Sequence, residues 1–262
     1  MFKKMSLGKG SLTHSGLPAP LVFIIIRTKN EEELIGKTLE ALERQTFRDF
    51  EIILVDDHST DKTLEIVKTF CARLRITVVP LRIGEFSHPY SENLGASKGK
   101  GDFLCFLPGH SLPSSDSWLA DGLSNFSDPQ VAGVSGGYTE VPVGYFCRRL
   151  GALFFPLWTR VRLTFDPNLS NTGSIIRRDL WRLYPFDERL AECEDYDWAC
   201  EMLARGYNII KDPRLNTFHS HLLLGQRRNY LSRWGRWAAL LSRIRRFERP
   251  RQSYTRLELP SS

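Results

Sequence analysis

Four groups of polar residues fall at the ends of expected strands and carry the side chains best suited to chemistry. They are Arg27-Thr28-Lys29-Asn30, Asp56-Asp57-His58-Ser59, Pro108-Gly109-His110 and Glu194-Asp195. Carboxylates can accept hydrogen bonds or take up a proton, and an imidazole can bind a metal ion or carry a proton. Ligands of an open parallel sheet bind beyond the carboxyl ends of its strands, so we expect these groups to converge on one site.

The elements that must position these groups alternate between strand-like and helix-like segments. The sequence predicts buried strands over 21–26, 51–55, 76–79 and 103–107 and a helix over 61–70. Asn30 and Glu33 have the spacing of a capping box, which predicts a further helix with an inner stripe of Leu34, Thr38, Leu39 and Leu42. This alternation with short connections indicates a parallel, doubly wound sheet flanked by helices.

The second half of the chain is less regular. The stretch VAGVSGGY predicts a strand entering a glycine-rich bend, and NTGSIIRRDL predicts a strand followed by a helix start. A helix is expected over EDYDWACEMLARGY with Gly206 at its carboxyl end, and NIIKDP reads as the last strand. Residues 145–161 fit either a helix or a mobile flap. The organisation we predict is a flexible leader over 1–18, one α/β domain over 19–225 and a basic tail over 226–262.

Charge is distributed unevenly along the 262 residues, whose net charge is +6. Residues 226–262 contain ten arginines and two glutamates, and residues 1–10 add three lysines, so the expected domain is acidic overall. A protein that binds nucleic acid would carry its basic surface on the folded body, so we expect no nucleic-acid partner. An excess in the tails favours an anionic membrane surface instead. The five scattered cysteines, with no C-x-x-C pair, favour reduced thiols in a cytoplasmic protein.

Two common phosphate-binding motifs are absent from the sequence. It has neither G-x-G-x-x-G after the first strand nor G-x-x-x-x-G-K-[ST], which argues against a dinucleotide-binding domain and a P-loop. Asp56 and Asp57 then have two interpretations, which can hold together. They form a turn that caps the next helix, or one of them accepts hydrogen bonds from the N–H groups of a pyrimidine base.

Three motifs in order carry a resemblance to a known family. The stretch FIIIRTKNEEELIGKTLEALERQTFRDFEIILVDDHSTDKT resembles the amino-terminal half of family 2 glycosyltransferases of the GT-A fold. CEDYDWACEMLARGY resembles their later acidic motif, and FSHPYSENLGASKGKGDFLCFLPGHSLPSSDSWL resembles the segment between them, above all in a bacterial rhamnosyltransferase-like subset. The resemblance covers about residues 20–225. It implies a GT-A-like domain with a mostly parallel central sheet flanked by helices.

The resemblance implies inverting transfer of a sugar from a nucleoside-diphosphate sugar. Thr28 and Asn30 then lie in the first nucleotide-binding loop, and Asp57 matches the carboxylate that holds the base. Asn93 matches an asparagine of the segment before the central strand. Asp195 matches the catalytic base, with Glu194 beside it; without the other motifs, an acidic, solvated helix start would be the preferred interpretation.

The family pattern places two aspartates where this chain has Pro108 and His110, and the second of them binds a divalent metal. We expect His110, with His219 or His221, to bind manganese or magnesium weakly, with manganese preferred over magnesium by nitrogen ligands. Such a histidine pair is otherwise a surface or packing feature. In a rival metal-free site, His110 positions the donor and arginines such as Arg177 or Arg227 neutralise the leaving group.

The tail from Tyr230 to Phe247 has helical spacing, with tryptophans on an apolar face and arginines opposite. This pattern predicts a helix lying on a membrane, or one packed on the domain. The sequence thus favours an enzyme that extends a glycan or a lipid-linked acceptor at the cytoplasmic face of a bacterial membrane. The alternative is a non-catalytic protein that binds sugar nucleotides or glycans and has lost its metal motif.

Overall fold

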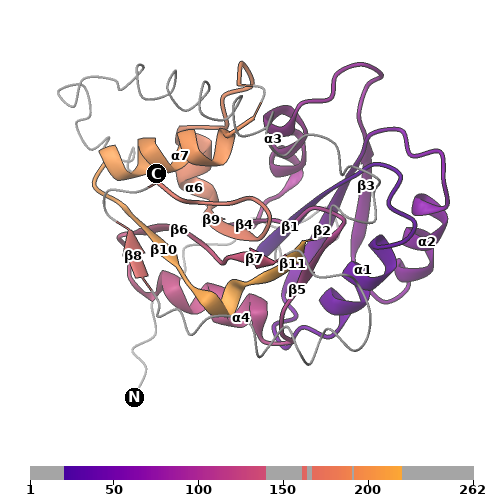
Figure 1. The fold of residues 1–262 in the computed structure, drawn as a ribbon, viewed down its shortest axis with the longest axis horizontal. Coiled ribbons are helices and arrows are strands. Elements are labelled where there is room, and N and C mark those ends of the chain that lie inside the picture. Colours follow the sequence, from indigo (N-terminus) through magenta and orange to yellow (C-terminus); the bar gives the residue numbers. More distant parts are fainter. Residues whose placement is uncertain (1–20, 140–160, 164–166, 191, 220–262) are drawn as a thin grey trace.

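The structure is a computed structural model that describes residues 21–139, 161–163, 167–190 and 192–219. The described residues form an eight-stranded central sheet and a three-stranded small sheet (Figure 1). From one edge to the other, the central sheet runs β3 (Ile76–Pro80), β2 (Phe50–Asp56), β1 (Val22–Thr28), β4 (Phe103–Phe106), β9 (Ser174–Arg177), β6 (Val131–Ser135), β10 (Asn208–Lys211) and β8 (Val161–Leu163).

The central sheet is mostly parallel, as predicted. Strands β3, β2, β1 and β4 are parallel to one another, and β10 is parallel to β6. The exceptions are β9, which runs antiparallel to both β4 and β6, and β8, which runs antiparallel to β10. Strand β9 therefore begins, rather than ends, at the edge where β4 and β6 end.

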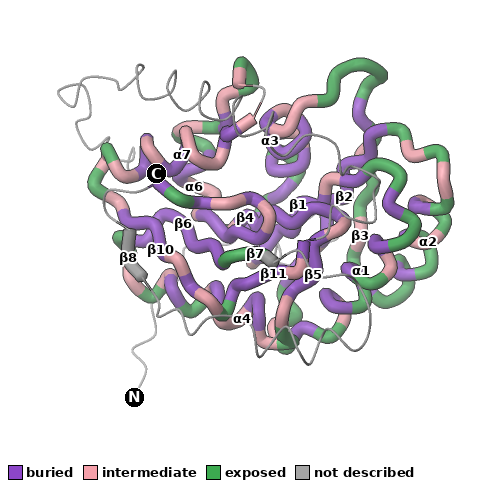
Figure 2. The backbone as a smooth tube through the Cα atoms, in the orientation of Figure 1, coloured by how far each residue is buried: buried purple, intermediate pink, exposed green. Residues whose placement is uncertain are grey.

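Helices cover both faces of the central sheet and divide its core in two (Figure 1). One face carries α1 (Ile35–Glu43), α2 (Thr63–Phe70) and α4 (Trp118–Leu123), and the other carries α3 (His88–Lys98), α6 (Arg178–Leu183) and α7 (Glu194–Ala204). Alternate side chains of β1 enter the two cores, which explains its continuous apolar run. Figure 2 shows the inner strands of the central sheet buried, whereas the edge strand β3 is partly exposed.

The small sheet was not predicted from the sequence. It consists of β5 (Ser111–Pro113), β11 (Thr217–His219) and β7 (Tyr138–Thr139), so the strand over 208–211 is not the last one. Short 3-10 helices lie at Ser124–Ser127 and Pro213–Leu215. The predicted glycine-rich bend follows β6, where a Cβ atom on Gly136 would lie 2.1 Å from the carbonyl oxygen of Leu215. Only glycine permits this approach of two backbones, and it lets β7 reach β11.

The first helix begins later than the capping-box pattern predicted. Helix α1 starts at Ile35, and Asn30 lies in a loop with φ 51°, where its side chain accepts a hydrogen bond from the N–H of Thr60. Asparagine tolerates this left-handed conformation, and its bond to the neighbouring loop replaces the expected cap. The predicted inner stripe of α1 is buried. Helix α7 spans Glu194–Ala204 and is followed by Gly206 at φ 85°, as predicted.

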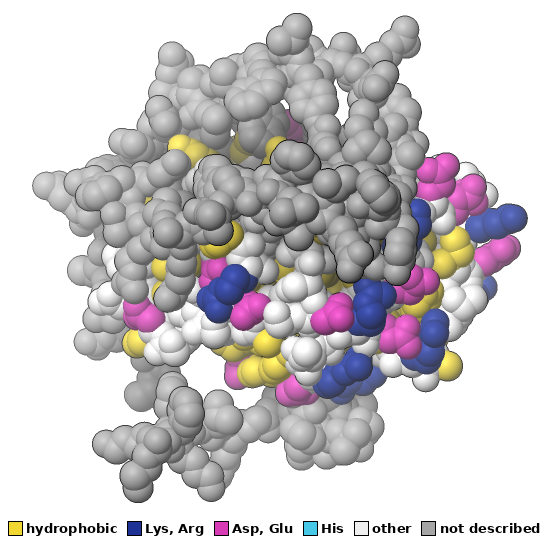
Figure 3. Space-filling model, turned by 60° about the horizontal axis from the view of Figure 1, so that its bottom comes forward, with side chains coloured by type: hydrophobic (Ala, Val, Ile, Leu, Met, Phe, Trp, Pro, Cys, Tyr) yellow, Lys and Arg dark blue, Asp and Glu magenta, His cyan; other side chains and the backbone are white. Residues whose placement is uncertain are grey.

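Several predictions fall outside the described residues. They concern the leader over 1–18, nearly all of the segment 145–161 and the basic tail over 226–262. Within the described part of the chain, no helix has the length and apolar character needed to cross a membrane. In the face shown in Figure 3, side chains of both charges are interspersed over the described surface.

Candidate active site

The loops after β1 and β2 form one bonded unit at the carboxyl edge of the sheet. Thr28 lies opposite Asp56 in the register of the two strands, and the N–H of Asp57 donates to the carbonyl oxygen of Thr28 at 3.0 Å. The N–H of Asn30 donates to Ser59 Oγ at 3.0 Å. The structure therefore brings together Thr28, Asn30 and Asp57, the three residues expected at the nucleotide.

The two neighbouring aspartates have different partners, and this separates the two interpretations of the motif. Asp56 accepts hydrogen bonds from the N–H and the hydroxyl of Ser59, so it makes the turn. Asp57 is also buried, but Lys29 Nζ lies 2.7 Å from its Oδ2 atom. Asp57 thus keeps acceptor capacity for a ligand beside a largely exposed lysine.

Left-handed backbone conformations are concentrated around this edge. Among the described residues, the non-glycine residues with positive φ are Asn30 at 51°, His58 at 53° and Cys193 at 69°. They lie in the loop after β1, in the loop after β2 and directly before Glu194. Such conformations cost free energy and persist where the surrounding contacts fix them, which is common at functional sites.

The loop after β4 is shaped by Gly109. Its N–H donates to the carbonyl oxygen of Arg27, and its carbonyl oxygen accepts from Thr38 Oγ1 at 2.7 Å. A Cβ atom on Gly109 would lie 2.0 Å from Glu31 Oε2, so the carboxylate of Glu31 occupies the space beside this glycine. Glu31 Oε1 lies 2.7 Å from His110 Nδ1. The contact between Glu31 and His110 was not predicted, because the capping-box pattern places Glu31 inside a helix.

The structure brings His110 and His219 together, since their ring centroids are 4.5 Å apart. Each imidazole already faces a side chain through Nδ1: His110 faces Glu31, and His219 Nδ1 lies 2.6 Å from Ser111 Oγ. No group of three or more histidine, cysteine, aspartate or glutamate side chains in the described ranges is arranged to hold a metal ion. His221 lies outside these ranges. The two imidazoles lie side by side, but the described residues alone do not complete a set of three metal ligands.

A second cluster of charged side chains surrounds Asp195 in the first turn of α7. Asp195 Oδ2 accepts from the N–H of Asn171 at 3.0 Å, and its Oδ1 accepts from the N–H of Tyr196 at 2.7 Å. The side chain of Asn171 donates to Glu92 Oε2 at 2.8 Å. Glu92 Oε1 lies 3.0 Å from Arg27 Nε, which joins this cluster to the end of β1. A continuous series of contacts therefore runs from the β1 loop to Asp195.

Burial raises the pKa of the acidic groups in this cluster. The pKa of Asp195 is raised by burial, against the opposing effect of the Asn171 and Tyr196 N–H groups, Lys211 and Arg27. Burial raises the pKa of Glu92 to about 7, with Arg27 lowering it and Asp195 raising it. Burial, followed by repulsion from Glu92 and Asp195, raises the pKa of Glu194 well above its usual value. Raised pKa values of this kind are common among carboxyl groups that take part in acid–base chemistry.

The side chain of Asn93 is used entirely for contacts within the protein. Both donor positions of the Asn93 amide are used by the Phe186 carbonyl oxygen and Glu188, and its oxygen accepts from Trp181 Nε1 and the N–H of Phe186. Asn93 thus joins α3 to the loop after α6 and has no polar atom left for a nucleotide.

Arg177 was wrongly expected near the leaving group. It pairs with Phe103, the first residue of β4, and therefore lies at the opposite edge of the sheet, where it binds Asp179. Arg227 lies outside the described residues. Among the described arginines, Arg27 lies at the site. Its place at the end of the first strand is a sequence signal for this location.

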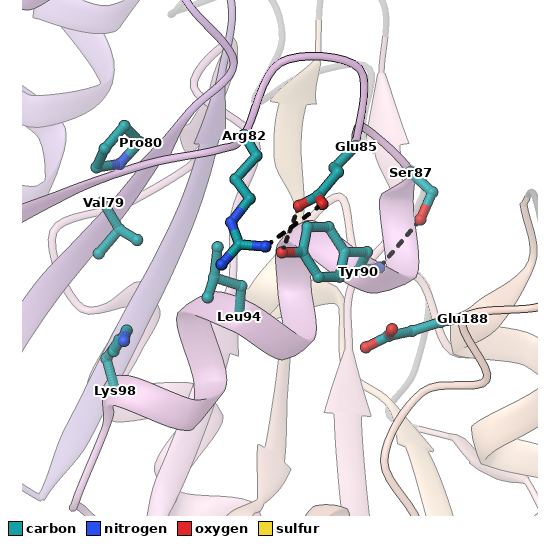
Figure 4. A pocket seen from close by; sticks show the side chains of 9 residues that line it. All are labelled: Val79, Pro80, Arg82, Glu85, Ser87, Tyr90, Leu94, Lys98 and Glu188. Atoms are coloured by element: carbon teal, nitrogen blue, oxygen red, sulfur yellow. Dashed lines mark hydrogen bonds and ion pairs between the residues drawn. The ribbon is translucent and has the colours of Figure 1, made fainter.

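A cavity of about 560 Å³ lies on the other side of α3 (Figure 4). It is open between the outer face of α3 and the edge strand β3, and its lining includes Val79, Arg82, Tyr90, Leu94 and Lys98. Tyr90, Leu94 and Lys98 are spaced four residues apart and share one face of the helix. Glu92 is buried on a different face, so this cavity is separate from the cluster around Asp195.

The family model described as glycosyl transferase family 2 matches residues 23–183. Glycosyltransferase AglE of Haloferax volcanii is 28% identical over 200 residues, which cover 72% of this chain and 64% of that protein. A Methanococcus voltae protein, dolichyl N-acetyl-alpha-D-glucosaminyl phosphate 3-beta-D-2,3-diacetamido-2,3-dideoxy-beta-D-glucuronosyltransferase, is 31% identical over 123 residues, covering 44% of this chain and 38% of its own.

Among solved structures, the mannosyltransferase PcManGT from Pyrobaculum calidifontis in complex with GDP-Man and Mn²⁺ has a similar fold. The TM-score is 0.66 with 22% sequence identity, over 86% of this chain and 63% of that one. The chain thus spans less than two thirds of the length of each of these three proteins.

Proposed function

Because this chain belongs to glycosyl transferase family 2, we propose that it moves a sugar from a nucleoside-diphosphate sugar to a hydroxyl acceptor with inversion at the anomeric carbon. The observation that carries this proposal is the arrangement around Asp195. Its carboxylate is partly buried at the start of α7, accepts two backbone N–H groups and is linked through Asn171, Glu92 and Arg27 to the β1 loop.

Asp195 is placed to act as the general base. Each of its oxygens accepts one backbone hydrogen bond, which leaves a lone pair on each for an acceptor hydroxyl. In the proposed step, Asp195 takes the hydroxyl proton while the acceptor oxygen forms a bond to the anomeric carbon. The bond from that carbon to the phosphate oxygen breaks, and its electron pair leaves with the nucleoside diphosphate. A raised pKa makes the carboxylate a stronger base for this proton.

The donor is held, in this proposal, by the loops after β1 and β2. Asp57 accepts hydrogen bonds from the base, and Thr28 and Asn30 border the same space. Among the described residues, we assign Arg27 and Lys29, at the end of β1, to the departing diphosphate. Cationic side chains stabilise the charge that develops on a leaving phosphate. Asn93 is no longer among the proposed donor contacts, because its amide is fully bonded.

A divalent cation has no defined role in the proposed step. Mn²⁺ is named in the structure of PcManGT, but the described residues here do not form a metal-binding group. The imidazole of His110 lies in the loop where the family has a metal ligand, and its contact with Glu31 holds it there. We propose that His110 contacts the donor directly.

For the acceptor we propose a growing glycan or a lipid-linked sugar. The name of the Methanococcus relative specifies a dolichyl-linked sugar phosphate as its acceptor, which supports this class. The basic tail over 226–262 would hold the protein at the cytoplasmic face of a bacterial membrane, because ten arginines attract anionic lipids. The rhamnosyltransferase-like subset stays a prediction.

A donor panel tests the proposal. The full-length chain is incubated with UDP-, dTDP- and GDP-sugars and a lipid-linked saccharide acceptor, and release of nucleoside diphosphate is measured with and without EDTA. We expect acceptor-dependent release with one donor class and a loss of less than about tenfold in EDTA, a factor equal to about 1.4 kcal/mol. Tight donor binding without turnover would support the non-catalytic alternative. Complete loss in EDTA, reversed by Mn²⁺, would overturn the assignment of His110 as a direct contact.

A further inference from the structure

Glu92 is a buried carboxyl group that the proposed reaction does not use. It lies on α3, its side chain is 1% exposed, and no sequence motif assigned it a function. A buried carboxyl costs free energy unless neighbouring groups compensate for it, so its contacts indicate what it contributes.

The contacts of Glu92 extend in three directions. One oxygen faces the guanidinium of Arg27 on β1 at 3.0 Å, and the other accepts from the side chain of Asn171 at 2.8 Å. On a third side, Glu194 at the start of α7 lies close enough to influence the pKa of Glu92. Glu92 therefore connects β1, the loop before β9 and the start of α7.

Asn171 carries this connection to Asp195. Its side-chain oxygen accepts from Ser174 Oγ at 2.7 Å, and its side-chain nitrogen donates to Glu92. With both ends of the amide fixed, the backbone N–H of Asn171 is held on Asp195 Oδ2 at 3.0 Å. A carboxylate that must accept a proton benefits from such fixed orientation, because small misplacements lower reaction rates strongly.

We propose that Glu92 is a positioning residue for Asp195, acting through Asn171 and anchored by Arg27. This inference rests on the proposed function of Asp195 as the general base. Glu92 need not touch the donor or the acceptor. It keeps the loop before β9 in the place where that loop can orient the reacting carboxylate.

The charges around Glu92 agree with this assignment. It faces Arg27 from β1 and Glu194 and Asp195 from α7; Arg27 in turn lies 2.5 Å from His88 Nδ1 on α3, and Lys211 from β10 acts on Asp195. Repulsion between Glu92 and Asp195 is reciprocal, so ionisation of Glu92 strengthens Asp195 as a base.

Two variants separate positioning from a general effect on folding. Glu92→Gln keeps an oxygen that can accept from Asn171, whereas Glu92→Ala removes it. We expect kcat to fall about tenfold in Glu92→Gln and about 100-fold in Glu92→Ala, with donor binding within a few-fold of wild type. Because Gln cannot ionise, the step near pH 7 in the pH profile of kcat should disappear in Glu92→Gln.

Glu201→Gln is the matched control. Glu201 is another buried glutamate paired with an arginine, 2.8 Å from Arg205 on α7, and it lies outside the cluster. This variant should keep the wild-type pH profile. Wild-type kcat in both Glu92 variants would overturn the proposal, and so would equal losses of kcat and donor binding in folded variants.

Hydrogen exchange tests the inference independently of sugar transfer. The amide of Asn171 is protected by its bond to Asp195, so Glu92→Ala should speed exchange at this amide about tenfold or more, while Glu92→Gln changes it less. Faster exchange in a protein without transferase activity would contradict only the proposed function. Unchanged exchange at Asn171 in Glu92→Ala would overturn the role of Glu92, whatever the protein's activity.

Discussion

The two parts of the candidate site differ in how their carboxylates are compensated. In the loops after β1, β2 and β4, each carboxylate faces its own partner, since Asp57 lies 2.7 Å from Lys29 and Glu31 lies 2.7 Å from His110. Around Asp195, by contrast, three carboxyl groups lie together, those of Glu92, Glu194 and Asp195. Arg27 lowers the pKa of all three, and Lys211 lowers the pKa of Asp195.

The difference indicates that one edge of the sheet can serve both nucleotide recognition and proton transfer. Carboxylates with their own partners are held in a fixed position, which suits recognition of a nucleotide. Carboxylates that crowd together in a buried place hold protons more tightly, which suits proton transfer. The acidic cluster should therefore dominate turnover and pH dependence, while the loops should dominate donor affinity.

Removal of the base is the strongest way to test this division. Asp195→Asn should lower the transfer rate by about 100- to 10,000-fold, because the amide keeps the shape but cannot take a proton. Donor affinity, measured by calorimetry, should remain. Asp197→Asn is the control, since Asp197 lies in the same helical turn and its side chain accepts from the hydroxyl of Tyr184. Turnover within a few-fold of wild type in Asp195→Asn would contradict the assignment.

The second prediction concerns stability against pH. The pKa of Glu92 is about 7 in the folded protein and 4.5 ordinarily, so the fold favours the protonated group. This contribution is fully present below pH 4.5 and is lost as the pH rises to about 7. The free energy of unfolding should therefore fall over this window, by an amount on the order of 3 kcal/mol from Glu92.

Denaturant titrations across that window measure the effect. Glu92→Gln should show a smaller decline than wild type, because one titrating group is gone. Glu201→Gln should follow the wild-type curve. An identical decline of the free energy of unfolding in wild type and Glu92→Gln would contradict the raised pKa of Glu92.

The smallest expected effect comes from the loop side. Gly109→Ala would place a Cβ atom 2.0 Å from Glu31 Oε2, so the His110 contact must shift; we expect a loss of about 2 kcal/mol in stability and weaker donor binding. Gly36→Ala, inside α1, is the control, because the added Cβ atom would make an ordinary contact of 3.4 Å with Ile66 of α2. That change should be neutral or stabilising by up to about 1 kcal/mol. Equal stability in both variants would contradict the packing at Gly109.

Sequence patterns predicted the first half of the fold well, because its strands are buried on both faces and read as continuous apolar runs. Periodicity could not give the direction of β9 or the small sheet. Both depend on pairings between distant segments, such as Ser111 with His219, and short strands carry no local signal of their partners.

For the site, the position of polar residues after strands predicted where the loops meet. The motif resemblance brought Asp57 and Asp195 forward as candidates. The sequence could not predict the roles of Glu31, Glu92 or Asn171. Glu31 contacts His110, and Glu92 contacts Asn171, and the two residues of each pair are 79 positions apart in the chain. A glutamate within a helical pattern looks like a solvated side chain until its neighbours are known.

The insertion of β9 also constrains when the molecule can become functional during synthesis. Strands β1 to β4 and the loop around Asp57 need only the residues up to the end of β4 at Phe106, whereas β5, next to His110, pairs with β11 at Thr217–His219. Strand β4 has its second partner only after Arg177 has been made, and Asp195 follows later still. Such distant pairings form slowly. The nascent chain therefore assembles its recognition loops first and carries an open strand edge, a target for chaperones or misassembly, until the catalytic half arrives.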